Sequence, residues 1–242
     1  MKTAIVTGAG AGIGKAICQK LSQNNYRVGM LDLNEENVNE ASKGIKNSVP
    51  LNGDVTNQES IKKAFEKFGE IPDRLVNNAG IIKRIPAIEM TPNDFRSVID
   101  VHLTGSFHMS QQFALPMLER QSGKIINICS MMSELGRSTV SAYAAAKGAI
   151  QALTREWAVA LAPDNIRVNC VMPAECHTDQ YEKFFQTSKN PEATRQAIGN
   201  LVPLSRRLTT PEEIAQTIVF LSSNCSSHTT GQHIFVDGGY TH

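Results

Sequence analysis

The sequence lacks the features that mark nucleic-acid-binding and membrane proteins. Among its 242 residues the formal net charge is only +1, because 24 Lys and Arg residues are balanced by 23 Asp and Glu residues. A near-neutral chain has no broad electrostatic attraction to nucleic acid or to an anionic membrane. No apolar run approaches the roughly 20 residues that a membrane-spanning helix needs. We therefore expect neither nucleic acid nor a membrane among its partners.

Cysteine is scarce, and no two cysteines form a Cys-x-x-Cys pair. The five are Cys18, Cys129, Cys170, Cys176 and Cys225. An odd number without paired spacing argues against a disulfide framework or a zinc site, and the histidines lack metal-ligand spacing, so we expect no metal. The N-terminal residues Met-Lys-Thr-Ala-Ile-Val-Thr-Gly contain no apolar signal region. These features favour the reducing cytoplasm.

Apolar, β-branched runs alternate with segments of helical period along the chain. The expected strands are residues 4–6, 27–31, 49–51, 75–76, 124–129, 166–171 and 234–236. The expected helices are residues 13–21, 35–46, 58–68, 95–120, 142–161 and a segment after Pro211, with Pro116 kinking or ending the fourth. This alternation predicts an α/β fold: a single Rossmann-like domain over residues 1–242, with a doubly wound parallel sheet of about seven strands.

One long segment shows little regular pattern. Residues 174–208 separate the sixth expected strand from the last expected helix. Long irregular segments in compact α/β domains often form lids or binding loops. We expect a substrate loop here.

A glycine-rich turn joins the first expected strand to the first expected helix. Its sequence, Thr7-Gly8-Ala9-Gly10-Ala11-Gly12-Ile13-Gly14, has the spacing T-G-x-x-x-G-x-G. A dinucleotide phosphate needs backbone N–H donors at a helix N-terminus and no Cβ in its way. We expect cofactor contacts at Gly8, Gly12, Ile13 and Gly14, although a tight strand–helix turn explains the glycines equally well.

Polar turns also follow the next three expected strands. Asp32 ends the second strand, where a carboxylate can accept a hydrogen bond from a ribose 2′-hydroxyl and repel a 2′-phosphate, and its neighbour Leu33 supplies no cation. This favours NAD, although Asp32 can equally be a turn or cap residue. The remaining expected cofactor contacts are Asp54, Val55, Asn78, Ala79 and Gly80. Ligands bind at this edge in open parallel sheets.

Three residues of the second half suggest proton chemistry. Tyr143 and Lys147 are four residues apart, so they share one face of a helix. An ammonium group lowers the pKa of a nearby phenol from its ordinary value near 10. Ser130 ends the fifth expected strand, where its hydroxyl can bind a reacting oxygen. Without the other motifs, Tyr143 and Lys147 would be interpreted as ordinary solvent-exposed residues on one face of a helix.

With these motifs in order, the chain resembles the short-chain dehydrogenase/reductase family over essentially its whole length. The matching segments are residues 7–14, Asn77-Asn78-Ala79-Gly80, Ser130 with Tyr143-x-x-x-Lys147, and the tail Asp237-Gly238-Gly239. The resemblance implies that Tyr143 is the catalytic acid/base, that Lys147 tunes its pKa and binds ribose, and that Ser130 orients the substrate. It also implies cofactor contacts at Tyr143, Lys147, Pro173 and Thr178, and a homotetramer that packs through helices around residues 102–109 and 144–158.

Two positions depart from the family pattern. The family has Asn where this chain has His102, and Gly where it has Ala174. In the family that Asn helps to hold a water near the catalytic Lys. His102 is therefore a candidate proton relay, while the alternative is a buried histidine bonded to backbone.

Substrate specificity is suggested by shorter resemblances. Residues 78–84 and 128–137 are similar to gluconate 5-dehydrogenases, and residues 173–175 and 236–242 to bacterial L-fucose 1-dehydrogenases. Both groups imply a polyhydroxylated substrate. The candidate substrate residues are Ser130, Glu134, Arg137, Tyr143, Glu175 and His177, although the charged ones can also be ordinary loop residues.

The sequence therefore predicts an NAD-dependent oxidoreductase that transfers a hydride between a sugar or sugar-acid hydroxyl and the nicotinamide. One alternative is a reductase of 3-oxoacyl-carrier substrates or other carbonyls. Another is a non-catalytic NAD(H)-binding regulator. The intact set of Ser130, Tyr143 and Lys147 argues against the regulator.

Overall fold

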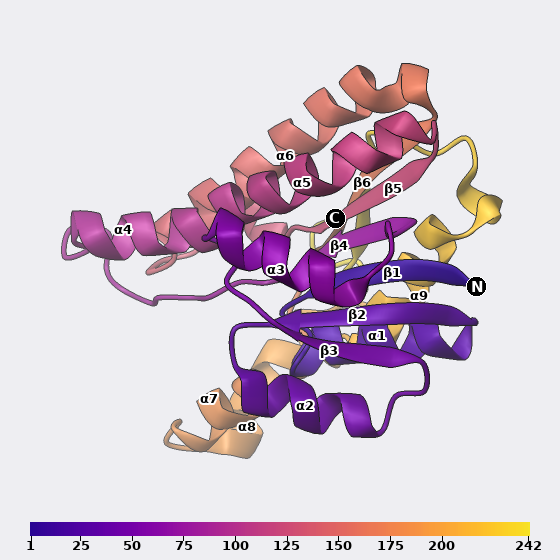
Figure 1. Cartoon of the computed structure of the whole chain (residues 1–242). Coiled ribbons are helices and arrows are strands. Elements are labelled where there is room, and N and C mark those ends of the chain that lie inside the picture. The colour runs from indigo at the N-terminus through magenta and orange to yellow at the C-terminus, as the bar shows by residue number, and fades with distance from the viewer.

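The computed structural model describes all 242 residues, built around one sheet with helices on both faces (Figure 1). The strands are β1 (Lys2–Thr7), β2 (Tyr26–Asp32), β3 (Ser48–Asn52), β4 (Arg74–Asn77), β5 (Gly123–Ile128), β6 (Ile166–Pro173) and β7 (His233–Val236). They run parallel in the order β3-β2-β1-β4-β5-β6-β7. The strand order reverses between β1 and β4, which is where a doubly wound sheet opens a crevice. The predicted α/β class and Rossmann-like sheet are confirmed.

Helices cover both faces because the strands bury side chains in both directions. The helices are α1 (Gly12–Gln23), α2 (Glu35–Lys43), α3 (Gln58–Phe68), α4 (Pro92–Ile99), α5 (Gly105–Glu119), α6 (Ser141–Leu161), α7 (Asp179–Gln186), α8 (Pro191–Gly199) and α9 (Pro211–Ser222). Along β1, Ala4 and Val6 pack with α1, α2 and α9, while Ile5 packs with α3 and α5 on the other face. This alternation is the period of two that an extended strand imposes.

The helix expected over residues 95–120 has a different internal structure. It begins earlier, at α4, passes through a π-helical turn at Asp100–Thr104 and continues as α5 to Glu119. Pro116 lies inside α5 and does not end it. Phe113 and Met117, both 1% exposed or less, anchor the helix on either side of the proline, so packing outweighs the lost backbone hydrogen bond. The second helix also ends earlier than expected, at Lys43.

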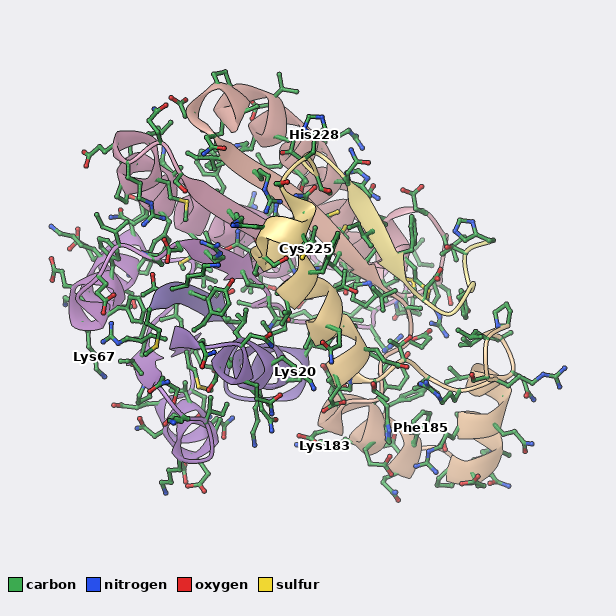
Figure 2. The ribbon with its side chains drawn as sticks, turned by 90° about the vertical axis from the view of Figure 1, so that its right-hand side faces the viewer. Lys20, Lys67, Lys183, Phe185, Cys225 and His228 are labelled. Carbon is green, nitrogen blue, oxygen red and sulfur yellow. The ribbon has the colours of Figure 1, made fainter.

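The segment expected to be irregular contains two helices, α7 and α8. Thr178 and Asn190 cap them, each accepting a hydrogen bond from a backbone N–H in the first turn. Figures 1 and 2 show this hairpin projecting from one end of the molecule, and Figure 2 labels Lys183 and Phe185 on α7. The helices are short, so their period is hard to detect in the sequence. None of the helices, here or elsewhere, combines the length and apolar character that crossing a membrane requires.

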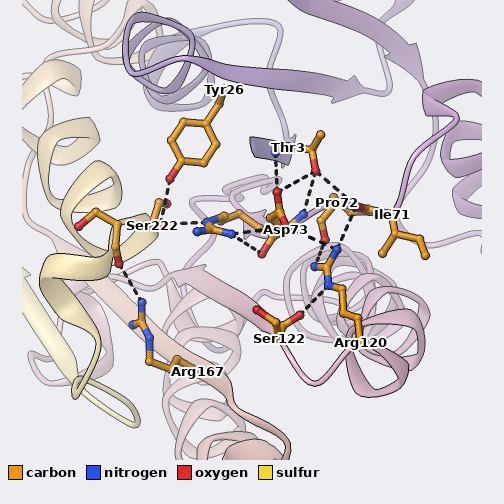
Figure 3. Close-up of polar contacts among 11 residues, drawn as sticks. Thr3, Tyr26, Ile71, Pro72, Asp73, Arg120, Ser122, Arg167 and Ser222 are labelled. Carbon is orange, nitrogen blue, oxygen red and sulfur yellow. Dashed lines mark hydrogen bonds and ion pairs between the residues drawn. The ribbon is translucent and has the colours of Figure 1, made fainter. Parts of the chain in front are cut away.

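The amino-terminal edge of the sheet holds a buried polar centre (Figure 3). Arg74 Nε and the Tyr26 hydroxyl both donate to the Ser222 carbonyl at 2.9 Å, and Arg167 donates to the Leu221 carbonyl at 3.0 Å. These carbonyls end α9, where the helix dipole favours positive charge. The centre stabilises the fold at the edge opposite to the one where ligands bind.

Candidate active site

A cavity of about 680 Å³ opens at the carboxyl ends of the strands. Most of the residues singled out in the sequence line it: Gly8, Gly12, Ile13, Gly14, Asp32, Asn78, Gly80, His102, Ser130, Arg137, Tyr143, Lys147, Pro173, Glu175 and Thr178. Six others do not: Leu33, Asp54, Val55, Ala79, Glu134 and His177. The sheet thus brings together residues from β1 to β6 that are far apart in the chain.

The glycine-rich turn is built for close backbone approach. Gly8 has φ +63°, and a Cβ there would lie 2.9 Å from the Cα of Ala79. A Cβ on Gly14 would lie 2.0 Å from the Gly8 carbonyl oxygen, so no larger residue fits. The first turn of α1 carries no acidic residue, and Ala11 makes no side-chain cap, so its N–H groups can receive an anion.

Asp32 is held firmly beside this turn. Its Oδ2 accepts a hydrogen bond from the Gly10 N–H at 2.8 Å, and its Oδ1 accepts one from the Asn34 N–H at 2.9 Å. Asp32 makes no ion pair. An uncompensated negative charge therefore stands at the end of β2.

The turn after β4 is tied to the turn after β1. The Asn78 side chain donates to the carbonyls of Thr7 and Gly8 at 2.9 and 3.1 Å.

The turn after β3 has its own hydrogen bonds. Asp54 Oδ1 accepts hydrogen bonds from the N–H and hydroxyl of Thr56, both at 2.8 Å, and Val55 is 7% exposed. In this structure Asp54 and Val55 thus shape the turn after β3 rather than the cavity wall.

Tyr143, Lys147 and Ser130 line the same cavity. Lys147 Nζ lies 5.5 Å from the centre of the Tyr143 ring and donates to the Ile128 carbonyl at 2.5 Å. Ser130 follows β5, and its hydroxyl accepts a hydrogen bond from the Met132 N–H at 3.2 Å. The α6 helix supplies the first two groups from one face, as their spacing predicts.

The pKa of Tyr143 differs from the expectation that Lys147 lowers it below its ordinary value near 10. Although part of Tyr143 faces the cavity, burial raises its pKa to about 12, while the Ser130 hydroxyl and the charge of Arg84 act in the opposite direction. Burial also lowers the pKa of Lys147 to about 8. The lysine therefore does not by itself convert Tyr143 into a phenolate, and the tyrosine of the protein alone carries its proton at neutral pH.

His102 lies in the π-helical turn, beside the pair. Its side chain is 3% exposed, and its Nε2 lies 2.7 Å from the Ile81 carbonyl oxygen and 3.1 Å from the Ile81 backbone nitrogen, so the ring is bonded to the backbone of Ile81. Nδ1 has no hydrogen-bond partner in the protein. Burial lowers the pKa of His102 to about 3, and the charge of Lys147 adds to this effect. The imidazole is therefore neutral, and a proton relay through it has to proceed without an imidazolium. The proton relay itself stays a prediction.

The four charged residues expected at the substrate have different surroundings. Glu175 is 4% exposed and accepts hydrogen bonds from Arg137 and from the hydroxyl of Tyr181. Glu134 accepts a hydrogen bond from Gln151 at 2.7 Å, outside the cavity wall. His177 is exposed and pairs with Glu182 at 3.2 Å. Of the four, only Arg137 and Glu175 line the cavity, and they are paired with each other.

The structure adds wall residues that the sequence analysis did not select. Arg84 lies with its guanidinium carbon 5.6 Å from the centre of the Phe184 ring and makes no ion pair. Tyr181 and Phe184 come from α7, and further apolar wall residues are Ile81, Ile82, Met131 and Met132. Arg84 lies within residues 78–84, the segment similar to gluconate 5-dehydrogenases. That similarity could have identified Arg84 as a substrate residue from the sequence. The aromatic residues were missed because α7 was not expected.

Comparison with known proteins fits this arrangement. A family model described as enoyl-(acyl carrier protein) reductase matches residues 8–241. The chain is 37% identical to a 3-oxoacyl-[acyl-carrier-protein] reductase of Thermotoga maritima, covering 98% of this chain and 97% of that one. It is also 37% identical to the 5-keto-D-gluconate 5-reductase of Escherichia coli, covering 98% and 94%.

Solved structures agree with the sequence matches. A protein of Agrobacterium tumefaciens described as a gluconate dehydrogenase superposes with a TM-score of 0.92 at 36% identity, covering 99% of this chain and 96% of that one. A 3-oxoacyl-[acyl-carrier protein] reductase of Brucella melitensis with bound NAD gives a TM-score of 0.89 at 32% identity, covering 100% and 91%. The chain belongs to the short-chain dehydrogenase/reductase family and is an oxidoreductase acting on CH–OH groups.

Proposed function

We propose that this protein is an NAD-dependent oxidoreductase that interconverts a hydroxyl and a keto group of a sugar acid. The observation that carries the proposal is Arg84, a cation on the cavity wall without a carboxylate partner. A guanidinium in this position can pair bidentately with the carboxylate of a sugar acid. Related proteins named for 5-keto-D-gluconate and gluconate support the same substrate class.

The residues at the other end of the cavity fit a dinucleotide. The glycine turn leaves room for a pyrophosphate at the start of α1, and Asp32 offers a carboxylate to a ribose diol. Among relatives, one structure holds NAD and one holds NADP, so family membership does not choose between them. We base the choice of NAD on the uncompensated charge of Asp32, which would repel a 2′-phosphate.

The proposed mechanism assigns one role to each central residue. When bound, the nicotinamide donates or accepts the hydride. During reduction the Tyr143 hydroxyl would pass its proton to the substrate oxygen, and during oxidation the Tyr143 phenolate would accept the proton of the substrate hydroxyl. Lys147 supplies positive charge behind the phenol, and Ser130 donates a hydrogen bond to the reacting oxygen. The high pKa of Tyr143 in the protein alone suits a proton donor.

The test is a substrate screen with purified protein and both cofactors. We expect oxidation of NADH with 5-keto-D-gluconate or another keto sugar acid, and little turnover with neutral aldoses. Arg84→Gln should raise the KM for the acid by about tenfold or more, the scale of a lost charged hydrogen bond. Turnover of neutral sugars at equal efficiency would contradict the proposal. Binding of NADH without turnover of any substrate would favour the regulator.

A second candidate is a 3-oxoacyl-carrier reductase. It is favoured by the apolar side chains of the substrate wall, Ile81, Ile82, Met131, Met132 and Phe184, which suit an acyl chain better than a row of hydroxyls. A relative with this name is equally similar in sequence. Including an acetoacetyl thioester in the same screen distinguishes the two, because efficient reduction of the thioester alone would favour this candidate.

We also propose that the protein is a cytoplasmic homotetramer. The outer faces of α5 and α6 expose large apolar side chains, with Leu115 59% and Val159 78% accessible. Exposed apolar surface of this kind is suited to association with a second copy. Light scattering at micromolar concentration should give the mass of four chains; a monomer mass would refute the assembly.

The cytoplasmic location is supported by the five free cysteines, which suit a reducing compartment.

A further inference from the structure

Glu175 stands where three walls of the cavity meet. It follows β6, its partner Arg137 lies in the loop before α6, and its partner Tyr181 lies on α7. Its Oε1 accepts from the guanidinium and its Oε2 from the phenol, while its side chain is 5% exposed. Each carboxylate oxygen of Glu175 therefore has one protein donor, and the two donors come from opposite sides of the cavity.

The segment that Tyr181 belongs to is attached mainly at its two ends. We call residues 178–208, which include α7 and α8, the lid. Where it leaves the body, the His177 N–H donates to the Thr209 carbonyl at 2.8 Å and the Thr209 N–H donates to the Glu175 carbonyl at 3.0 Å. Near its end, the Leu204 N–H donates to the Gly238 carbonyl at 2.9 Å. These bonds hold the base of the lid but do not fix α7 over the cavity.

The lid hairpin has its own small aromatic core, in which the Phe185 ring centre lies 5.6 Å from that of Tyr181. Phe185 is fully buried, with the guanidinium of Arg195 4.9 Å from its ring centre, and Arg195 also pairs with Glu182 at 2.9 Å. These contacts join α7 to α8. They hold the hairpin together, so it can move as one piece about its base.

Tyr181 and Phe184 on α7 each make a contact with a residue outside the lid, and the two contacts differ in strength. Tyr181 and Phe184 are three residues apart, on one face of the helix. Phe184 meets Arg84, an exposed cation whose attraction to the ring is weak because water competes for it. The Tyr181 hydroxyl instead donates to a buried carboxylate, which is the stronger kind of hydrogen bond.

We propose that Glu175 is a positioning residue that clasps the lid to the Arg137 loop, and so sets substrate affinity without touching the substrate. The hydroxyl of Tyr181 is the link on the lid and the guanidinium of Arg137 the link on the body. The effect on affinity rests on the proposed function, because the lid covers the substrate end of that site. The clasp itself is a property of the protein alone and can be measured separately.

Hydrogen exchange in the protein without ligands tests the clasp. In Tyr181→Phe and in Glu175→Gln, the amides of residues 179–186 should exchange about tenfold faster or more, because α7 loses its charged hydrogen bond. Tyr26→Phe is the matched control, since it removes a hydroxyl bonded to the Ser222 carbonyl far from the cavity. Its α7 amides should exchange as in the parent. Unchanged exchange in Tyr181→Phe and Glu175→Gln would overturn the clasp.

Steady-state kinetics with NADH and the keto sugar acid that passes the screen test the effect on affinity. Both Tyr181→Phe and Glu175→Gln should raise KM by about tenfold and change kcat much less, because the chemical groups stay in place. If Glu175→Gln raises KM while Tyr181→Phe does not, Glu175 binds the substrate directly and the positioning role is wrong. A loss in kcat with KM unchanged would also overturn it. If no sugar acid is turned over, the proposed function fails, and the exchange experiment still decides whether the clasp exists.

Discussion

The rings of His102 and Tyr143 meet edge to face, with their centres 5.1 Å apart and their planes at 88°. The contact joins a residue of the π-helical turn to the expected acid/base on α6. Gly80 makes room for it, because a Cβ there would lie 2.2 Å from His102 Cε1. His102 is therefore packed tightly and still adjacent to the proton chemistry.

We predict that His102→Asn keeps substantial turnover, because an amide can also bind a water near Lys147. His102→Leu should slow turnover markedly while the affinity for NADH stays nearly unchanged. Stopped-flow turnover and fluorescence titration measure the two effects. Normal turnover in His102→Leu, or loss of activity only through unfolding, would mean that His102 has a packing role alone.

The depressed pKa of His102 also predicts a pH dependence of stability. The folded protein binds a proton at about pH 3, whereas an unfolded histidine binds one near pH 6.5. Its contribution is therefore complete above pH 6.5 and declines as the pH falls toward 3. Between pH 7 and 5 the wild-type protein should lose about 2 kcal/mol of unfolding free energy that His102→Asn does not lose. Urea denaturation at the two pH values measures this, and equal losses in both proteins would contradict the buried neutral state.

For the cofactor, Asp32→Ala should reduce kcat/KM with NAD by about tenfold or more, because a charged hydrogen bond to the ribose is lost. The efficiency with NADP should rise as the repulsion disappears. Glu35→Gln is the control, since this exposed acid lies nearby at the start of α2. Wild-type efficiency with NADP equal to that with NAD would contradict the assignment.

Tyr143→Phe removes the proton-transfer group and keeps the ring that packs against His102. Turnover should fall by at least about a hundredfold, which is the scale of general acid–base catalysis. The dissociation constant of NADH should change little. A variant with near-normal turnover would show that another group transfers the proton.

Several features of the protein follow from local sequence. The alternation of β-branched runs and helical periods determines most strands and helices, because side-chain period and backbone conformation are linked within a few residues. The glycine turn and the shared face of Tyr143 and Lys147 are local in the same way. The positions of these motifs after β1 and on α6 were therefore predictable before the sheet order was known.

Other features depend on segments that are distant in the chain. The sequence does not reveal that Arg137, Glu175 and Tyr181 meet, or that Glu134 and His177 lie outside the cavity wall, because loop directions are set by packing. The same holds for the pKa of Tyr143 at about 12 and that of His102 at about 3. Both depend mainly on burial, and burial exists only once strands and helices from the whole chain have closed around the site.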